Sequence, residues 1–183
     1  MSAAPCFVRW AGCSGAPSLP SVIRRAIDAA LLKREPYLVM VVRPDGVADG
    51  AMVVAAVYAL LMIPWVLDGI GIITATRVIL YGLVNWIILS GLVYLIGRYL
   101  LDGDGSYPGT MAATAIGHPV LLAGILLAPI LDPWRAQLVA SLWLVATLWV
   151  AAGVALELPK TRAAVAAVGG WVAFFVVSLI FRF

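Results

Sequence analysis

AQLVASLWLVATLWVAAGVAL, residues 136–156, is the stretch that decides the fold class of this chain. It contains no Asp, Glu, Lys or Arg, and it has about the 20 residues that a helix needs to cross roughly 30 Å of hydrocarbon. Four further stretches share these properties: residues 51–67, 78–97, 111–131 and 163–181. The sequence therefore predicts an all-α polytopic membrane protein with five transmembrane helices.

The composition of the whole chain indicates the same class. Apolar residues make up 64% of its 183 residues and charged residues 11%, against roughly 45–50% and about 25% in soluble domains. So few charged side chains cannot cover the surface of a small soluble domain. This excludes a soluble enzyme, a nucleic-acid-binding domain and a disordered chain. The lipid bilayer is the expected environment, and no nucleic-acid partner is expected.

The first fifty residues are the polar part of the chain and form a segment separate from the membrane domain at residues 51–183. Residues 1–20 read as an irregular tail without the apolar core of a signal peptide. Residues 21–34 predict an amphipathic helix that ends before Pro36, with a turn following at residues 43–46. Its membrane-surface residues are expected to be Val22, Ile23, Arg24, Arg25, Ile27 and Leu31. This helix either lies in the headgroup layer or packs on the protein's own loops.

The distribution of Lys and Arg predicts the orientation of the five spans. Nine of these residues lie in the N-terminal segment and in the loops after the second and fourth spans, and three lie on the other side. Cytoplasmic loops carry the excess of positive charge. The N-terminus is therefore expected in the cytoplasm and the C-terminus outside.

Few side chains in the sequence are candidates for catalysis, metal binding or cofactor binding. The spans contain no ionisable carboxylate or amine, which disfavours an ion-coupled transporter. His118 is a weak candidate for a cofactor ligand, because no second ligand type accompanies it. Cys6 and Cys13 are expected to be ordinary thiols. We expect no catalytic residue, metal or cofactor, but two alternatives stay open: a cofactor-bearing subunit that uses His118, and a small oligomeric channel or transporter lined by Asn85, Ser90 and Thr147.

The most distinctive polar stretch is the loop at residues 98–110, RYLLDGDGSYPGT. Its three glycines are expected to permit positive φ and tight turns. Either Ser106 or Thr110 is expected to cap the third span. The loop follows a helix and has no Gly-Lys-Ser/Thr, so it does not fit a phosphate-binding loop.

At this loop the sequence resembles the Yip family of five-span membrane proteins, the Rab/Ypt-interacting protein domain. The similarity runs from about residue 77 to residue 183, and a weaker similarity extends over residues 24–67. It rests on the aliphatic–aromatic run at 92–96, the glycine turn with Ser106 and Tyr107, the small residues 110–117, and Pro119 with the aliphatic run after it. Trp134 at the fourth span and residues 160–163 before the fifth fit as well.

The resemblance implies a non-enzymatic membrane scaffold or adaptor of prokaryotic type, in a bacterial inner (plasma) membrane. Its partners would be other integral membrane proteins or copies of itself, and it would be an accessory subunit of a larger complex or a membrane-organising protein. The Asp-Leu-Tyr-Gly-Pro motif of the eukaryotic branch is missing before the first span, so no Rab-type GTPase partner is expected. His118 also stands where a small or aromatic residue is expected. The interaction loop would comprise Gly103, Asp104, Gly105, Ser106, Tyr107 and Pro119.

Overall fold

The chain folds into a helical bundle, and the computed structural model describes residues 19–181 of it. Every regular element in that range is a helix, which confirms the predicted all-α class. In chain order they are α1 (Leu19–Ala30), α2 (Arg34–Val42), α3 (Gly46–Leu67), α4 (Ile72–Leu95), the π-helical turn η1 (Ile96–Leu100), α5 (Tyr107–Ala115), the 3₁₀ turn η2 (His118–Leu121), α6 (Leu122–Leu127), α7 (Pro133–Ala155) and α8 (Lys160–Phe181).

Five segments are long and apolar enough to cross a membrane, as the sequence predicts: Gly46–Leu67, Ile72–Leu100, Tyr107–Leu127, Trp134–Ala155 and Lys160–Ile180. Several of them extend beyond the apolar stretches, because helical hydrogen bonding continues into polar ends that hydropathy does not mark. Helix α3, for example, begins at Gly46 and includes Asp49 in its first turn. The Asp49 carboxylate suits the positive end of the helix dipole and pairs with Arg43 at 2.8 Å.

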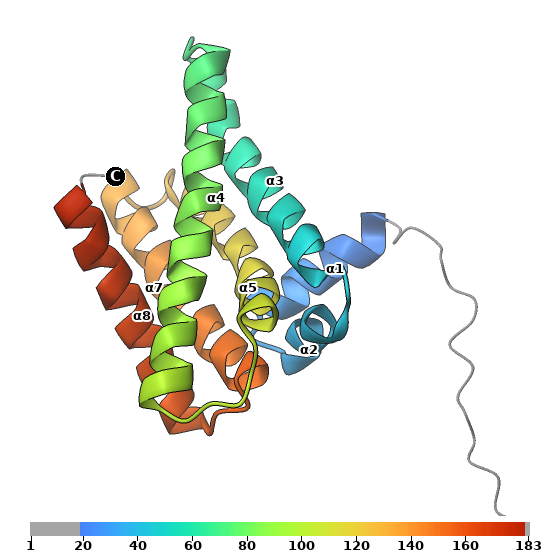
Figure 1. The fold of residues 1–183 in the computed structure, drawn as a ribbon. Coiled ribbons are helices and arrows are strands. Elements are labelled where there is room, and N and C mark those ends of the chain that lie inside the picture. The colour runs from blue at the N-terminus through green and yellow to red at the C-terminus, as the bar shows by residue number, and fades with distance from the viewer. Residues whose placement is uncertain (1–18, 182–183) are drawn as a thin grey trace, which may run out of the picture.

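Two antiparallel hairpins, α3–α4 and α7–α8, pack around α5 (Figure 1). Helix α5 contacts α2, α3, α4 and α7. The α4–α5 and α7–α8 connections lie together at one end of the bundle, and the α3–α4 connection lies at the other (Figure 1). Helix α2 packs against the start of α5 and the end of α7, so it belongs to the first of these ends. We call that end, with α1 and α2, the N-terminal end.

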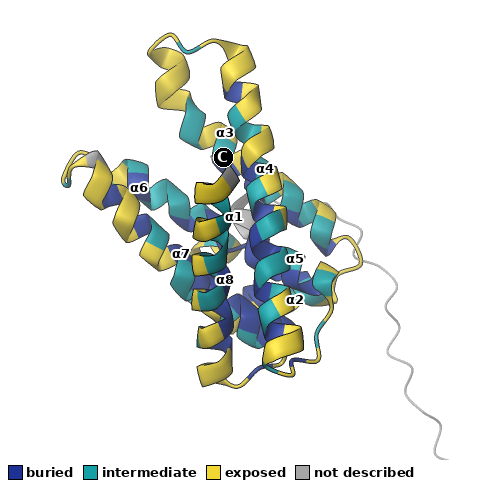
Figure 2. Ribbon diagram, turned by 60° about the vertical axis from the view of Figure 1, so that its left-hand side comes forward, coloured by how far each residue is buried: buried dark blue, intermediate teal, exposed yellow. Residues whose placement is uncertain are grey.

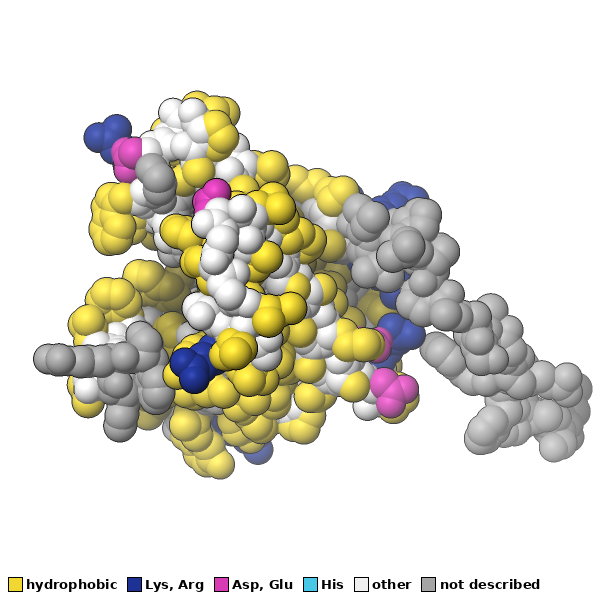
Figure 3. All heavy atoms as spheres, turned by 90° about the horizontal axis from the view of Figure 1, so that it is seen from above, with side chains coloured by type: hydrophobic (Ala, Val, Ile, Leu, Met, Phe, Trp, Pro, Cys, Tyr) yellow, Lys and Arg dark blue, Asp and Glu magenta, His cyan; other side chains and the backbone are white. Residues whose placement is uncertain are grey.

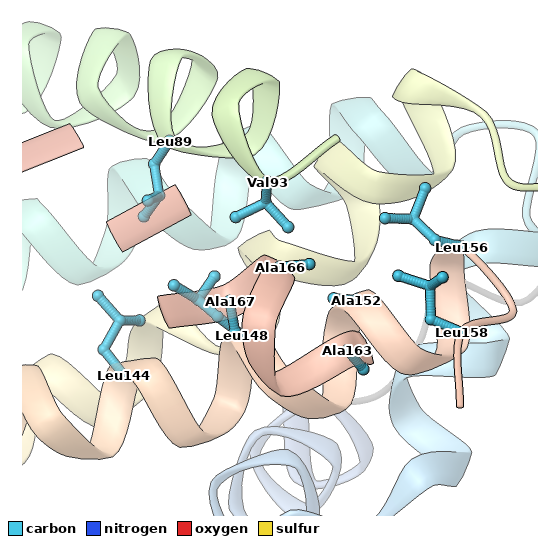
Figure 4. Packing of buried hydrophobic residues seen from close by; sticks show 10 residues of the cluster. All are labelled: Leu89, Val93, Leu144, Leu148, Ala152, Leu156, Leu158, Ala163, Ala166 and Ala167. Atoms are coloured by element: carbon cyan, nitrogen blue, oxygen red, sulfur yellow. The ribbon is translucent and has the colours of Figure 1, made fainter. Parts of the chain in front are cut away.

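Small residues bring α4, α7 and α8 close together in the largest buried cluster (Figure 4). Ala152 of α7 and Ala166 and Ala167 of α8 are completely buried. A side chain at Gly170 would come within 3.1 Å of the Val93 backbone nitrogen, so α8 meets α4 at backbone distance. In lipid, such close approach replaces the hydrophobic drive that holds helices together in water.

Apolar side chains on the outer faces of the spans are left uncovered by the protein. Figure 2 shows exposed residues along the outside of α4, α7 and α8 and over the protruding α3–α4 tip. Seen from the end that carries this tip, the surface is mostly hydrophobic and its charged side chains are few and scattered (Figure 3). This is the surface expected of a protein whose solvent is lipid.

The third span is interrupted, as proline within a span predicts. Helix α5 ends at Ala115, and the chain then passes through η2 before α6 begins at Leu122. Pro119 lacks an N–H group, and its ring would clash with the carbonyl of Ala115 in a continuous helix. The α-helical part of the span is therefore broken between Ala115 and Leu122.

Candidate interaction face

The amphipathic helix exists, but it ends earlier than the sequence suggests. Helix α1 stops at Ala30, and Leu32 takes a positive φ of 61° that turns the chain back into α2. The expectation that Pro36 ends this helix is wrong, because Pro36 lies in the first turn of α2. An N–H group has no helical partner in the first turn, so proline is tolerated there.

Two aromatic side chains fix the C-terminal end of α1 to the bundle. The hydroxyl of Tyr37 donates to the Ala29 carbonyl at 2.9 Å, and Nε1 of Trp143 donates to the Ala30 carbonyl at 2.9 Å. The last carbonyls of a helix have no partner within it. The Trp143 bond satisfies the Ala30 carbonyl, and the Tyr37 bond adds to the one that the Ala29 carbonyl accepts from the Leu32 amide at 2.9 Å. Burial raises the pKa of the Tyr37 phenol, which therefore stays protonated and able to donate.

The apolar side of α1 is only partly covered. Ala29 is buried against α2, whereas Ile27 is 54% and Leu31 60% exposed. Arg24 and Arg25 are also exposed, and the side chains of Val22 and Ile23 are not among those that the structure describes. Helix α1 thus packs on the protein through one edge and leaves large apolar side chains free for another surface.

Helix α2 carries a second uncovered apolar strip. Tyr37 and Met40 are buried against α5 and α7, but Leu38 is 48% and Val42 78% exposed. Leu38 and Val42 line a shallow hollow on the surface together with Val39, Arg43 and Pro44. The buried half of α2 therefore holds the strip in place while its outer half is available to a partner.

The glycine-rich loop is held firmly against the α7–α8 connection. The Gly103 amide donates to the Gly97 carbonyl at 2.9 Å, and the Asp104 amide donates to the Leu156 carbonyl at 3.1 Å. Arg98 donates to the Gly103 carbonyl and pairs with the Asp104 carboxylate at 3.0 Å. This loop is a rigid, hydrogen-bonded edge that exposes the Asp104 side chain.

The glycines act differently from the sequence expectation of positive φ, which is wrong for this loop. Among the described glycines only Gly69 has a positive φ, and in the loop it is Asp102 that takes one, at 56°. Gly103 and Gly105 are required for close approach instead. A Cβ on Gly105 would overlap the Ala155 carbonyl oxygen and lie 2.8 Å from the Leu156 Cα.

Ser106 and Tyr107 join this loop to the membrane helices. The Gly109 amide donates to Ser106 Oγ at 3.2 Å, so Ser106 is the cap of α5 that the sequence left undecided. Thr110 Oγ1 donates to the Ser106 carbonyl at 3.0 Å. The Tyr107 hydroxyl donates to the Ile87 carbonyl of α4 at 3.2 Å. Ser106 and Tyr107 therefore fix the end of the loop to α5 and α4.

Pro119 does not join the rest of the predicted interaction loop. It lies in η2, beyond the whole of α5, which is about 14 Å long. Its role is the break in the third span described above. The structure thus brings together residues 103–107 with the α7–α8 connection and leaves Pro119 inside the membrane domain.

His118 and the span hydroxyls form a satisfied polar core. His118 is 2% exposed, and its Nδ1 donates to the Thr114 carbonyl at 3.0 Å. The Thr114 hydroxyl bonds the Ser90 hydroxyl at 2.7 Å and accepts from Trp86 Nε1 at 3.2 Å. Within residues 19–181 no group of three His, Cys, Asp or Glu side chains gathers, and Cys6 and Cys13 lie outside the described residues.

The three residues considered for a pore differ in their burial. Ser90 and Thr147 are completely buried, and Thr147 donates to the Leu144 carbonyl of its own helix at 2.7 Å. Asn85 is only half-buried. Polar side chains that bond a backbone carbonyl in this way serve helix packing.

Comparison with known proteins identifies a family. Residues 34–181, from the start of α2 to the end of α8, match a family model described as the Yip1 domain. The comparison with curated proteins and the comparison with solved structures found no match.

Proposed function

This chain belongs to the Yip1 domain family and is an integral membrane protein, and from that premise we propose that it is a non-enzymatic scaffold or adaptor. Its interaction face is the N-terminal end of the bundle, formed by α1, α2 and the loop at residues 101–106. Other integral membrane proteins, or further copies of the chain, bind this face. The chain is then an accessory subunit of a larger complex or an organiser of the bilayer around it.

The observation that carries this proposal is the combination of anchoring and exposure in α1 and α2. The buried Tyr37 and the partly exposed Trp143 fix both helices to the bundle, yet Leu38 and Val42 on α2 remain uncovered. Contiguous exposed apolar side chains on a rigid support favour a protein or membrane contact. The fixed glycine loop extends this support with the exposed carboxylate of Asp104.

We expect the apolar strip of α2 to determine complex formation. Membranes containing the full chain are extracted in mild detergent, separated on a native gel, and co-migrating proteins are identified by mass spectrometry. The wild type should migrate in a discrete heavy complex. Leu38→Asp/Val42→Asp should reduce that complex about tenfold or more, because two apolar contacts are replaced by charges.

The matched control is Leu38→Met/Val42→Ile, which keeps the apolar surface and should keep the complex. Comparable thermal unfolding of all three chains shows that the aspartates act at the surface and not on the fold. A heavy complex that survives the aspartates, or a wild type that migrates alone, would contradict the adaptor proposal.

The same proposal places α1 in the headgroup layer on the cytoplasmic side of a bacterial inner membrane. The side chains of Ile27 and Leu31 would insert between the lipid headgroups, while those of Arg24 and Arg25 would stay in water. We expect a nitroxide attached at position 31 of the reconstituted full chain to be relaxed more by oxygen than by a water-soluble nickel complex. A nitroxide at position 24 should show the reverse.

These single-cysteine chains, made in a Cys6→Ser/Cys13→Ser background, also test the orientation. A membrane-impermeant maleimide should label position 24 in inverted vesicles and not in right-side-out vesicles, since nine of the twelve Lys and Arg residues belong to the N-terminal segment and the two loops expected on its side. Equal relaxation by the nickel complex at positions 24 and 31 would show that α1 does not lie in the lipid headgroup layer. Labelling only in right-side-out vesicles would reverse the topology.

A further inference from the structure

A cleft of about 440 Å³ opens at the N-terminal end, between the α1–α2 turn and the α7–α8 hairpin. Its walls are apolar over much of their area and come from Leu32, Trp149, Val150, Gly153, Leu158 and Ala163. Trp149 Nε1 donates to the Lys160 carbonyl at 2.7 Å, which fixes the indole in the lining of the cleft. Because α7 and α8 are both membrane-spanning segments, the apolar side of this cleft continues onto lipid-facing helices.

Two cationic side chains complete the lining. Arg34 comes from the start of α2 and Lys160 from the start of α8, and both are exposed. No Asp or Glu is among the described residues that line the cleft. The ion pairs of the described chain engage Lys33, Arg43, Arg98 and Arg135, and none of them includes Arg34 or Lys160. The cleft therefore has two unpaired positive charges beside an apolar floor.

We propose that this cleft binds one anionic phospholipid of the bilayer, with its phosphate between Arg34 and Lys160 and an acyl chain along Trp149, Val150 and Gly153. Cations at the end of a span attract anionic headgroups, and a Trp ring at the same level suits the interface between headgroup and acyl chain. A soluble anion would use the charges and leave the apolar floor empty. This binding site is independent of the adaptor proposal, because it uses neither Leu38 nor Val42.

The test uses the full chain, delipidated in detergent and titrated with phosphatidylglycerol or with phosphatidylcholine of the same acyl chains. Native mass spectrometry counts the lipids bound per chain. We expect one phosphatidylglycerol to bind at least about tenfold more tightly than phosphatidylcholine. Arg34→Gln/Lys160→Gln should abolish that preference, since each cation near the surface contributes to headgroup binding.

Two control chains separate this site from general charge effects. Arg77→Gln/Arg135→Gln removes two charges from the opposite end of the bundle and should leave the preference unchanged. Arg34→Lys/Lys160→Arg keeps the charges and should keep it as well. Unfolding temperatures within a few degrees of the wild type establish that the glutamine chain is folded.

Three results would overturn the proposal. Equal affinities for phosphatidylglycerol and phosphatidylcholine would show that the headgroup charge does not contribute to binding. A preference retained in Arg34→Gln/Lys160→Gln would place the lipid elsewhere. Displacement of phosphatidylglycerol by millimolar glycerol phosphate would show a site for a soluble anion, because the apolar floor then contributes nothing.

Discussion

Gly105→Ala should lower the unfolding temperature of the chain in detergent by about 10 °C. The new Cβ would lie 2.7 Å from the Ala155 carbonyl carbon and would overlap its oxygen. Both neighbours are backbone atoms, so the loop has to move away from the α7–α8 connection. Overpacking of this kind costs about 3 kcal/mol, and the shift also breaks the hydrogen bond from Asp104 to Leu156.

The matched control is Gly71→Ala. Gly71 has an ordinary φ of −63°, and a Cβ there meets nothing within 4 Å. The same chemical change should therefore leave the unfolding temperature almost unchanged. Heating the two variants and the wild type in parallel, followed by fluorescence-detected size-exclusion chromatography, provides the measurement. Similar curves for Gly105→Ala and Gly71→Ala would show that the loop is not held as tightly as the geometry indicates.

Tyr37→Ala should detach α1 and α2 from the bundle. Tyr37 is completely buried and is the largest side chain that α2 contributes to the core. Its loss removes the ring from the cluster with Ala112 and Ala151 and also the hydrogen bond to Ala29. Large-to-small substitutions of buried aromatic residues cost about 3–5 kcal/mol.

Tyr37→Phe separates the two contributions, because it keeps the ring and removes only the donor. It should cost about 1 kcal/mol, the net contribution of one hydrogen bond, because the Ala29 carbonyl still accepts from the Leu32 amide at 2.9 Å. Limited trypsin digestion after Lys33 and Arg34 is the local readout, since both are exposed on the α1–α2 turn. Cleavage should be fast in Tyr37→Ala and slower in Tyr37→Phe. Equal, slow cleavage in all chains would mean that α2 is held by other contacts.

These two substitutions also bear on the proposed interaction face. The adaptor proposal requires a rigid support for Leu38 and Val42, and Tyr37 provides it from the buried side of the same helix. Tyr37→Ala should therefore weaken the heavy native complex even though it leaves both apolar side chains in the sequence. Tyr37→Phe should weaken it less.

Much of the fold could be predicted from the sequence because the membrane imposes strong rules. A run such as residues 136–156, with no ionisable side chain, can satisfy its backbone in lipid only as a helix. The break before α6 has a local cause in the missing N–H and the ring of Pro119. The small residues of the last two spans also pack at the centre of the bundle, as their size indicates.

The candidate site was less accessible to sequence reasoning. Gly103 and Gly105 stand out in the sequence, but composition suggested tight turns with positive φ where the structure shows backbone contacts with Ala155 and Leu156. The roles of Tyr37 and Trp143 were missed, because each donates to a carbonyl whose position depends on how α1 folds back. Nothing local in the sequence marks an aromatic residue as a hydrogen-bond donor to a distant helix end.

The sequence by itself determined the class of the protein: an all-α chain with five spans and its positive charges concentrated on one side. Hydropathy and helix length act locally, so they can be read without knowing which segments meet. Only the tertiary structure decided that α2 is a support within the bundle, that the glycine loop is rigid, and that Arg34 and Lys160 face the same cleft. Each of these depends on residues far apart in the chain, and their contacts arise only when the helices pack.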